Sequence, residues 1–526
     1  MVKALGLDAK DSELQQLIKQ LKAMGGKEQL LLFLTGMAGA GKSSGLTVAQ
    51  AFCFEFSKAV GIRWHENTFL FTAYTGAAAS LFGGRTTTKA TYAAKELDRI
   101  TDDDIKEYES VRILVLDEIS FLRDKELLAI DKALKKVGER RKPFGGFSIV
   151  FSGDFMQETP VGSGSKEQIW HPKTSQHFEN NINSAVILEG MHRFKDDPRY
   201  GNFLKQVWLT GTFPEEDEEY LNSRVIGSRT GLELPRELDG ETCYACPFNA
   251  ERNAITGGIF QEHLRQTHPL ANSDELPPEH TVMVEADVQP TVVNQSYNHG
   301  RMRRLVLELG DDKVRYGRKL VDPCLRLYPG AHFMCVDNDD LNDGPVESRR
   351  GNGTQCRVVG LKMKDQAEKR VKMWDGRKVW TVSCKDVEYI EFEKLTGGRF
   401  KMTPSTRTVA VKDNGMEMKC KITQFMVNSS DAVTGHKLQG MTKDNVIVVS
   451  WNKRINWIYV VLSRPRTLGG LYSFKRLRFK DIKKPESFKE YQAFMERMRR
   501  LEARGECSAG AAEYGEGESG GPNSSH

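Results

Sequence analysis

The glycine-rich run from Gly36 to Ser43 restricts the fold of this chain more than any other segment. It follows an apolar run, Leu30–Thr35, that we expect to form a strand, and it precedes a stretch that we expect to form a helix from Ser44. This is the pattern G-x-x-x-x-G-K-S in the strand–loop–helix context that it requires. Glycines let backbone N–H groups close around phosphate oxygens, and the helix N-terminus adds partial positive charge. The run therefore predicts a site for a nucleoside triphosphate.

The residues of this run have separate expected roles. Lys42 should reach the β- and γ-phosphates, and the Ser43 hydroxyl should bind Mg²⁺. An ordinary glycine turn before a helix is the alternative, which the strand, the spacing and the Lys-Ser pair together disfavour. The predicted nucleotide-binding residues of the run are Gly36, Ala38, Gly39, Ala40, Gly41, Lys42, Ser43 and Ser44.

Two acids follow a second apolar strand, Arg112–Leu116. The carboxyl end of a strand is the edge of an open α/β sheet where ligands bind, so Asp117 is placed to support Mg²⁺ and Glu118 to activate water as a general base. A solvated acidic turn is the common alternative, but the pairing with the glycine-rich run disfavours it. The second acid favours hydrolysis over transfer to a small acceptor. After a further strand, Phe147–Ser152, the neutral Gln157 suits a sensor that hydrogen-bonds water and the γ-phosphate.

Apolar runs that alternate with helical stretches indicate an α/β fold with buried parallel sheets. We expect a first unit over residues 1–185, including a short helix at Ser12–Met24, and a second unit that begins near Val186. The second unit should comprise 186–280 and 425–475, interrupted at 281–424 by a β-rich insert. A basic helical extension is predicted at 476–504 and a disordered tail at 505–526.

Composition excludes a mostly disordered chain, because 39% of the 526 residues are hydrophobic and 28% are charged. The net charge of +5 neither demands nor excludes a polyanionic partner. Nine scattered cysteines indicate reduced thiols, and the N-terminal residues lack the apolar core of a signal peptide. We therefore expect a soluble intracellular protein with no membrane contact, nuclear if the source is eukaryotic.

Six short motifs resemble those of superfamily-one helicases, in the same order along about residues 10–475. They are most similar to the petite-integration-frequency family of the RecD-like branch. The motifs are Thr72–Ala79 (TAYTGAAA), Asp117–Ser120 (DEIS), Gly153–Gln157 (GDFMQ), Leu188–Arg193 (LEGMHR), Thr434–Thr442 (TGHKLQGMT) and Tyr459–Arg464 (YVVLSR). Gly330–Met334, followed by Gly351–Thr354, resembles the approach to the SH3-like domain of this branch.

This resemblance implies two RecA-like P-loop domains with an SH3-like insert in the second, and the activity of an ATP-dependent DNA helicase with ATP and Mg²⁺ as cofactors. It implies movement 5′-to-3′ on single-stranded DNA, opening of tailed duplexes, action as a monomer, and work in replication, repair, recombination or telomere maintenance. Arg193 and Arg464, which we place on the second unit, should stabilise charge on the γ-phosphoryl group. Gln439 and Gly440 are implied to bind nucleotide. The implied DNA-binding residues are Thr75, Gly76, Thr87, His436 and Lys437.

Some features depart from the family pattern or leave alternatives open. Glu158-Thr159 replaces Leu-Pro after Gln157, and the T-I-H segment appears as Thr86–Thr88 without its histidine. An RNA-directed or transposon-associated helicase, or a switch that hydrolyses nucleotide without unwinding, are the functional alternatives.

Two segments carry local alternatives of their own. Cys243, Cys246, His263 and His268 approximate a zinc finger, but the middle gap is longer than usual. Cys246–Ile255 instead resembles the strand-to-helix segment of the helicase family. The basic segment 474–504 either packs Phe488, Tyr491, Phe494 and Met495 onto the body or binds phosphate.

Overall fold

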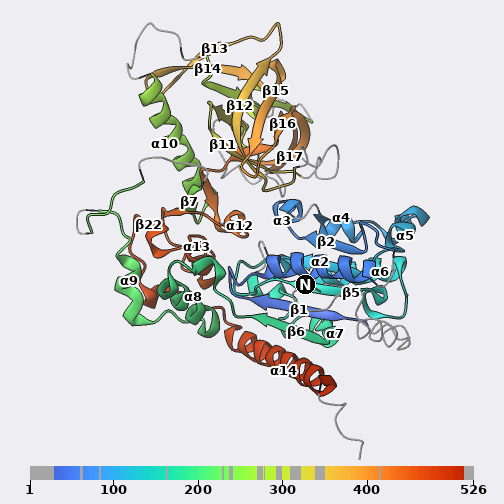
Figure 1. The fold of residues 1–526 in the computed structure, drawn as a ribbon. Helices are drawn as coiled ribbons and strands as arrows, with labels where there is room; N and C mark the ends of the chain where they lie inside the picture. Colours follow the sequence, from blue (N-terminus) through green and yellow to red (C-terminus); the bar gives the residue numbers. More distant parts are fainter. Residues whose placement is uncertain are drawn as a thin grey trace, which may run out of the picture. The chain divides into compact units, whose positions relative to one another are not determined.

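The computed structural model describes residues 29–59, 63–81, 84–160, 164–227, 230–235, 241–268, 277, 279–291, 299–307, 321–337, 350–413 and 416–513. The helix expected at Ser12–Met24 lies outside these residues. The chain divides into two compact units (Figure 1). The first comprises Met1–Tyr74, Thr86–Lys195 and Lys484–His526, and the second comprises Thr75–Arg85 and Asp196–Lys483.

A six-stranded sheet forms the centre of the first unit (Figure 1). In spatial order its strands are β3 (Arg85–Thr86), β2 (Phe69–Ala73), β4 (Ile113–Asp117), β5 (Ser148–Ser152), β1 (Leu31–Gly36) and β6 (Ser184–Leu188). The pairs from β2 through β6 are parallel. Strands β1, β2, β4 and β5 confirm the four strands that the sequence predicts here, at Leu30–Thr35, Thr68–Tyr74, Arg112–Leu116 and Phe147–Ser152. Their side chains are almost all buried, as a parallel sheet covered on both faces requires.

The strand β6 corrects the predicted start of the second unit. It pairs in parallel with β1, with Val186 opposite Leu34, so it belongs to the first sheet. The sequence of an apolar strand does not specify which sheet the strand joins, and the prediction that β6 starts the second unit was therefore wrong. As a consequence Arg193, which follows β6, also lies in the first unit and not in the second.

Helices and short 3₁₀ turns connect the strands of the first unit (Figure 1). The α-helices are α2 (Lys42–Ala59), α4 (Thr87–Ala90), α5 (Asp102–Tyr108), α6 (Asp124–Val137), α7 (His177–Asn181) and α14 (Phe488–Glu513). The 3₁₀ turns are η1 (Leu97–Arg99), η2 (Ile119–Phe121), η3 (Pro143–Gly146), η4 (Gly164–Glu167) and η5 (His192–Phe194).

The last helix, α14, packs against the first sheet beside β6 (Figure 1). Phe494 is fully buried, with its ring 5.7 Å from that of Phe33 and 6.2 Å from that of Phe178. The Glu502 carboxylate accepts a hydrogen bond from the Ile187 amide at 2.6 Å. The packing alternative for the basic segment is therefore confirmed for the helix. Its bounds differ from the prediction, because the helix begins at Phe488 and continues to Glu513, through alanine-rich residues where disorder was expected.

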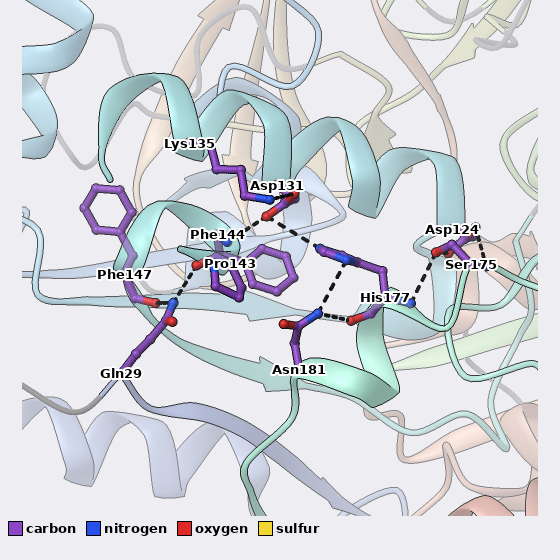
Figure 2. A network of polar contacts seen from close by, with 10 residues as sticks. All are labelled: Gln29, Asp124, Asp131, Lys135, Pro143, Phe144, Phe147, Ser175, His177 and Asn181. Atoms are coloured by element: carbon purple, nitrogen blue, oxygen red, sulfur yellow. Dashed lines mark hydrogen bonds and ion pairs between the residues drawn. The ribbon is translucent and has the colours of Figure 1, made fainter. Parts of the chain in front are cut away.

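A polar network joins α6, η3 and α7 (Figure 2). Asp131 is 5% exposed; its carboxylate accepts hydrogen bonds from Phe144 N at 2.7 Å and Lys135 Nζ at 2.8 Å, and His177 Nε2 lies 3.5 Å away. Burial by itself would raise the pKa of Asp131, but His177, Lys135 and the Phe144 amide together lower it to about 2. Three separate elements are thus held by one charged carboxylate.

The second unit is built on a four-stranded sheet of parallel strands. Its strands are β20 (Ala432–Thr434), β7 (Thr242–Cys246), β21 (Asn445–Val448) and β22 (Leu471–Ser473). The last two confirm the strands that the sequence predicts at Asn445–Ser450 and Leu471–Phe474. The helical elements outside the insert are α3 (Gly76–Leu81), α8 (Pro198–Thr210), η6 (Glu215–Asp217), α9 (Glu218–Asn222), α10 (Asn249–Thr267), α12 (Gly435–Leu438), α13 (Ile455–Leu462), η8 (Leu468–Gly470) and η9 (Phe479–Asp481).

The predicted β-rich insert is present in the second unit between β7 and β20 (Figure 1). An antiparallel sheet contains β16 (Arg399–Met402), β15 (Val387–Lys394), β12 (Gln355–Met363), β11 (His332–Cys335) and β19 (Val427–Ser429). A mixed sheet contains β10 (Cys324–Leu327), β8 (Val282–Glu285), β14 (Arg377–Ser383) and β13 (Arg370–Trp374). A third contains β17 (Ser405–Asp413), β18 (Met416–Gln424) and β9 (Asp287–Pro290), with α11 (His299–Leu307) and η7 (Cys384–Asp386) beside the strands. The likeness of this insert to an SH3 domain stays a prediction.

None of the helices in the described part of the chain has the length and the apolar character that crossing a membrane requires.

Candidate nucleotide-binding site

The loop between β1 and α2 has the backbone conformation of a phosphate cradle. Gly36, Gly39 and Gly41 have φ angles of +149°, +83° and +93°, which side-chain-bearing residues rarely adopt. The Ala40 amide donates to Met37 O at 3.1 Å, and the first helical hydrogen bond joins Gly45 N to Gly41 O at 2.8 Å. The glycines of the predicted pattern are therefore required by the loop geometry.

The same glycines make room for the segment that follows β6. A β-carbon on Gly36 would lie 2.5 Å from Leu188 O, and one on Gly39 would lie 2.5 Å from the Cβ of Arg193. The Arg193 amide also donates to Gly39 O at 3.4 Å. Arg193 is thus in contact with the phosphate loop within one unit, as a residue that stabilises the γ-phosphoryl group needs to be, although it lies on a different unit from the one predicted.

Lys42, the first residue of α2, is held against the loop. Its Nζ donates to Gly36 O at 2.7 Å and to Met37 O at 3.2 Å. Burial lowers the pKa of Lys42, Arg193 lowers it further, and the carboxylates of Asp154, Glu118 and Asp117 act in the opposite direction. Three acids and a second cation therefore surround the amine predicted to bind phosphate.

Asp117, the last residue of β4, and Glu118, which follows it, belong to this acidic cluster. Asp117 is 8% exposed, and burial raises its pKa, whereas the Ser152 hydroxyl, the Glu118 amide and Lys42 lower it. Glu118 has a φ of +58° and a ψ of +41°, a left-handed conformation that is costly for a residue with a side chain. Strain of this kind is typical of functional sites, where it fixes the direction of a side chain.

Gln157 belongs to a tight turn after β5. Its Nε2 donates to Asp154 Oδ2 at 3.2 Å, and its amide donates to Asp154 O at 3.1 Å. The Met156 amide donates to the other carboxylate oxygen at 3.0 Å, so Asp154, which is 1% exposed, organises the turn. Asp154 was not selected from the sequence, although its position two residues after the strand, within the quoted motif, was a signal that could have identified it.

The donor set fits the cofactors that the sequence implies. Ser43 and Ser44 are exposed on the first turn of α2, beside the loop amides. A hydroxyl and a buried carboxylate are oxygen ligands of the kind that Mg²⁺ prefers, so Ser43 and Asp117 would hold the ion, and Asp117 gains a reason for its costly burial.

Arg464 lies in the second unit, where its guanidinium is bonded to main-chain and hydroxyl oxygens. Its Nε donates to Val460 O at 2.8 Å, Nη1 to Met441 O at 3.1 Å, and Nη2 to Ser463 Oγ at 2.6 Å. These bonds hold the segments before and after β21 together. The role of Arg464 toward ATP stays a prediction.

The signature segment of the second unit surrounds α12. Gln439 is 9% exposed and its amide donates to Gly435 O at 3.1 Å, whereas Gly440 has a φ of +83° that ends the helix. Lys437 Nζ donates to Asn352 Oδ1 of the insert, and His436 lies on the same helical turn. Nucleotide binding by Gln439 and Gly440, and DNA binding by His436 and Lys437, stay predictions.

The remaining predicted DNA-binding residues have unequal accessibility. Thr75 precedes α3, where its Oγ1 accepts from Ala78 N at 3.3 Å, and Gly76 is the first residue of that helix. Both are grouped with the second unit. Thr87 is 3% exposed and its hydroxyl is 3.1 Å from that of Thr72, so the structure favours a structural role for Thr87.

The four residues of the zinc-finger alternative have other roles. Cys243 and Cys246 lie on β7 with a separation that directs their side chains to opposite faces, and the predicted strand and helix are confirmed as β7 and α10. Burial raises the pKa of the two thiols to about 11 and about 12, which opposes the thiolate that zinc requires. His263 stacks on Tyr328 with 3.9 Å between ring centroids.

Across the described residues no group of three or more His, Cys, Asp or Glu could hold a metal ion. The absence of zinc stays a prediction. Elemental analysis of the purified protein checks it, and one zinc per chain that is lost in Cys243→Ser would contradict it.

Comparison with known proteins agrees with the motifs. Residues 10–199 match the family model described as PIF1-like helicase. The ATP-dependent DNA helicase PIF1 of Saccharomyces cerevisiae is 30% identical over 365 residues, which cover 63% of this chain and 40% of that protein. The ATP-dependent DNA helicase Pif1 of Psychrobacter sp. is 23% identical over 483 residues, which cover 84% of this chain and 65% of that protein. The chain thus spans less than two thirds of the length of either relative.

Solved structures of Pif1 helicases share the fold. A Pif1 helicase from Bacteroides in complex with ADP-AlF3 and single-stranded DNA aligns with a TM-score of 0.58 and 20% identity over 93% of this chain and 97% of that one. The Candida albicans Pif1 helicase aligns with a TM-score of 0.57 and 19% identity over 92% of this chain and 99% of that one. The predicted fold of two RecA-like domains and the resemblance to PIF-type superfamily-one helicases are therefore confirmed.

Proposed function

We propose that this chain, a relative of the PIF1-like helicases, is an ATP-dependent DNA helicase that moves along single-stranded DNA in the 5′-to-3′ direction and opens tailed duplexes. The observation that carries the proposal is the cluster around Lys42: a phosphate loop closed by three left-handed glycines, with Asp117, Glu118 and Asp154 near the amine and Arg193 on Gly39. Relatives that match this chain are named ATP-dependent DNA helicases.

The residues of the cluster divide the work of hydrolysis. The loop amides and Lys42 bind the phosphates and hold them in place, which supplies much of the catalysis of phosphoryl transfer. Ser43 and Asp117 would hold Mg²⁺, which would supply positive charge beside the phosphate oxygens. Glu118, fixed by its strained backbone, orients the attacking water and takes its proton. Arg193 stabilises the charge that spreads over the γ-phosphoryl oxygens in the transition state.

Gln157 is held by Asp154 so that its amide senses whether the γ-phosphate is present. Arg464 adds a second guanidinium to the transition state. The grip on DNA belongs to Thr75, Gly76, His436 and Lys437, because a motor that passes any sequence must hold the backbone and not the base edges.

ATP hydrolysis with and without nucleic acid tests this proposal. We expect single-stranded DNA to stimulate hydrolysis strongly, and single-stranded RNA of the same sequence to stimulate it weakly. Stronger stimulation by RNA would favour an RNA-directed helicase. Hydrolysis that no nucleic acid stimulates would favour a switch that does not unwind.

A further inference from the structure

Two lysines of the signature region reach the same turn of the β-rich insert. Lys437 Nζ, on α12, donates to Asn352 Oδ1. Lys443 Nζ, directly after the signature segment, donates to Gln355 Oε1 at 2.7 Å. Gln355 is the first residue of β12 and Asn352 lies in the turn before it, so both contacts join the signature region to the antiparallel sheet of the insert.

The turn that receives the lysines is tightly held. Gly353 has a φ of +100°, and its amide donates to Cys335 O at 2.8 Å at the end of β11. Gly351 and Thr354 bond to each other through the Thr354 amide at 3.0 Å and the Thr354 hydroxyl at 3.0 Å. The turn therefore moves with β11 and β12 and not as a loose loop.

Lys443 contacts the Arg464 segment through its main chain. Its amide donates to Arg464 O at 3.2 Å, and the guanidinium of Arg464 donates to the nearby Met441 O at 3.1 Å. Lys443 is 3% exposed, and a buried cation is costly unless polar groups satisfy it. Gln355 supplies such a group. Lys443 therefore bonds to the insert through its side chain and to the Arg464 segment through its main chain.

Bound DNA would affect the hydrogen bonds of the two lysines differently. In the proposed function Lys437 binds a phosphate, and that phosphate competes with Asn352 for the ammonium group. Lys443 is buried and not accessible to a phosphate, so DNA leaves its bond to Gln355 in place. Coupling between two sites can be carried by a chain of hydrogen bonds, and Lys443 bonds to both the insert and the Arg464 segment.

We propose that Lys443 is a positioning residue that couples the β-rich insert to the Arg464 segment through its hydrogen bond to Gln355. This inference rests on the proposed function, because the coupling links DNA bound at Lys437, which contacts the turn of the insert, to hydrolysis of ATP.

A double-mutant cycle with Lys443→Met and Gln355→Leu tests the coupling. The readout is the factor by which single-stranded DNA stimulates ATP hydrolysis. Each single variant should lower this factor by about two- to tenfold, as expected for one lost hydrogen bond, and the double variant should lower it no further than either single variant. Lys362→Met is the matched control, because Lys362 lies on the same strand β12 but is 55% exposed and pairs with Glu388; it should leave the factor unchanged.

Additive losses in the double variant, or an equal loss in Lys362→Met, would overturn the proposal. A lower melting temperature without any change in stimulation would also overturn it, since that result is expected of a merely structural lysine. Amide hydrogen exchange without DNA gives a second, independent test: residues 351–357 should exchange faster in Lys443→Met than in the unmodified protein. If DNA does not stimulate the unmodified protein at all, the proposed function fails, whereas unchanged exchange at 351–357 would refute the Lys443 contact itself.

Discussion

At the scale of single residues, the nucleotide site depends on backbone conformations that few side chains permit. Gly39 and Gly41 are left-handed and lie against Arg193 and His192, so a methyl group on Gly39 would collide with Arg193 at 2.5 Å. Glu118 also has a positive φ, of +58°, but it carries a side chain in a conformation that favours glycine. Strain of this kind persists only where the surrounding structure enforces it, and at Glu118 it sets the direction of a carboxylate next to Asp117.

Lys42 and Glu118 should separate binding from hydrolysis. Lys42→Ala removes a charged phosphate contact and should weaken ATP binding by about 10- to 100-fold and abolish hydrolysis. Glu118→Gln should bind ATP with nearly unchanged affinity but hydrolyse it at least about 100-fold more slowly, because the general base is lost. Equilibrium binding of a fluorescent ATP analogue and single-turnover hydrolysis measure the two effects. Equal loss of binding in both variants would contradict this division.

These residues could be identified from the sequence, because a phosphate loop requires particular residues at fixed spacing between a strand and a helix. The identity of Lys42, Asp117 and Glu118 follows from a strand, a fixed pattern and a second strand end. The contact between Gly39 and Arg193 could not be predicted, because it depends on β6 pairing beside β1 and not in another sheet. The burial of Thr87 and the partners of Arg464 are likewise set by tertiary packing.

At the scale of elements, the first unit is stabilised by contacts among its helices and between its last helix and the sheet. Asp131 joins α6 to η3 and α7 through one buried carboxylate (Figure 2). Phe494 of α14 adds an aromatic side chain to a cluster with Phe33, Phe155 and Phe178. Both features lie outside the nucleotide site, so they should affect stability more than chemistry.

Asp131→Asn should make the free energy of unfolding depend less on pH in the acid range. The pKa of Asp131 is lowered to about 2 from 3.8, so its ionised form stabilises the fold above pH 3.8, and this contribution is lost as the pH falls toward 2. At neutral pH the variant should be less stable by about 1–3 kcal/mol, and the difference should shrink below about pH 4. Urea unfolding at several pH values measures this, and a difference that stays constant down to pH 2 would contradict it.

Phe494→Ala should destabilise the first unit without weakening DNA binding. Loss of a fully buried phenylalanine costs about 3–5 kcal/mol. Gln492→Ala, an exposed position on the same helix, should have almost no effect. Thermal unfolding and the salt dependence of single-strand binding are the measurements. If Phe494→Ala or removal of residues 485–526 flattened the salt dependence while stability stayed the same, α14 would bind phosphate and the packing account of its function would be wrong.

At the scale of the whole molecule, the two units carry different parts of the predicted chemistry. Lys42, Glu118 and Arg193 belong to the first, whereas Arg464 and Lys437 belong to the second. The β-rich insert lies in the second unit, where Lys437 and Lys443 contact its turn at 351–355. The positions of the parallel sheets and of the insert along the chain were predictable. Buried parallel strands are continuous apolar runs in the sequence, whereas the insert lacks such runs. The assignment of Thr75–Arg85 and α14 to their units was not predictable, since both return from distant parts of the chain.

Lys437→Ala should weaken single-strand binding in a way that depends on salt. A lysine that contacts one phosphate of a single strand contributes about 0.7 to the slope of log affinity against log salt concentration, so the variant should have a slope reduced by about that amount. Lys480→Ala, an exposed lysine of the same unit, is the control and should keep the slope. Fluorescence anisotropy at four or more salt concentrations gives both slopes. An unchanged slope in Lys437→Ala would remove this residue from the DNA-binding site.

The central claim is that hydrolysis at the Lys42 cluster drives movement along DNA in one direction. Unwinding of duplexes that carry a single-stranded tail of either polarity tests this most directly, with Glu118→Gln as the hydrolysis-deficient control. The account predicts that the chain opens the 5′-tailed duplex with ATP, that it leaves the 3′-tailed duplex closed, and that Glu118→Gln opens neither. Opening of only the 3′-tailed duplex would contradict the assigned direction, and failure to open any tailed duplex while DNA still stimulates hydrolysis would contradict the assignment as a helicase.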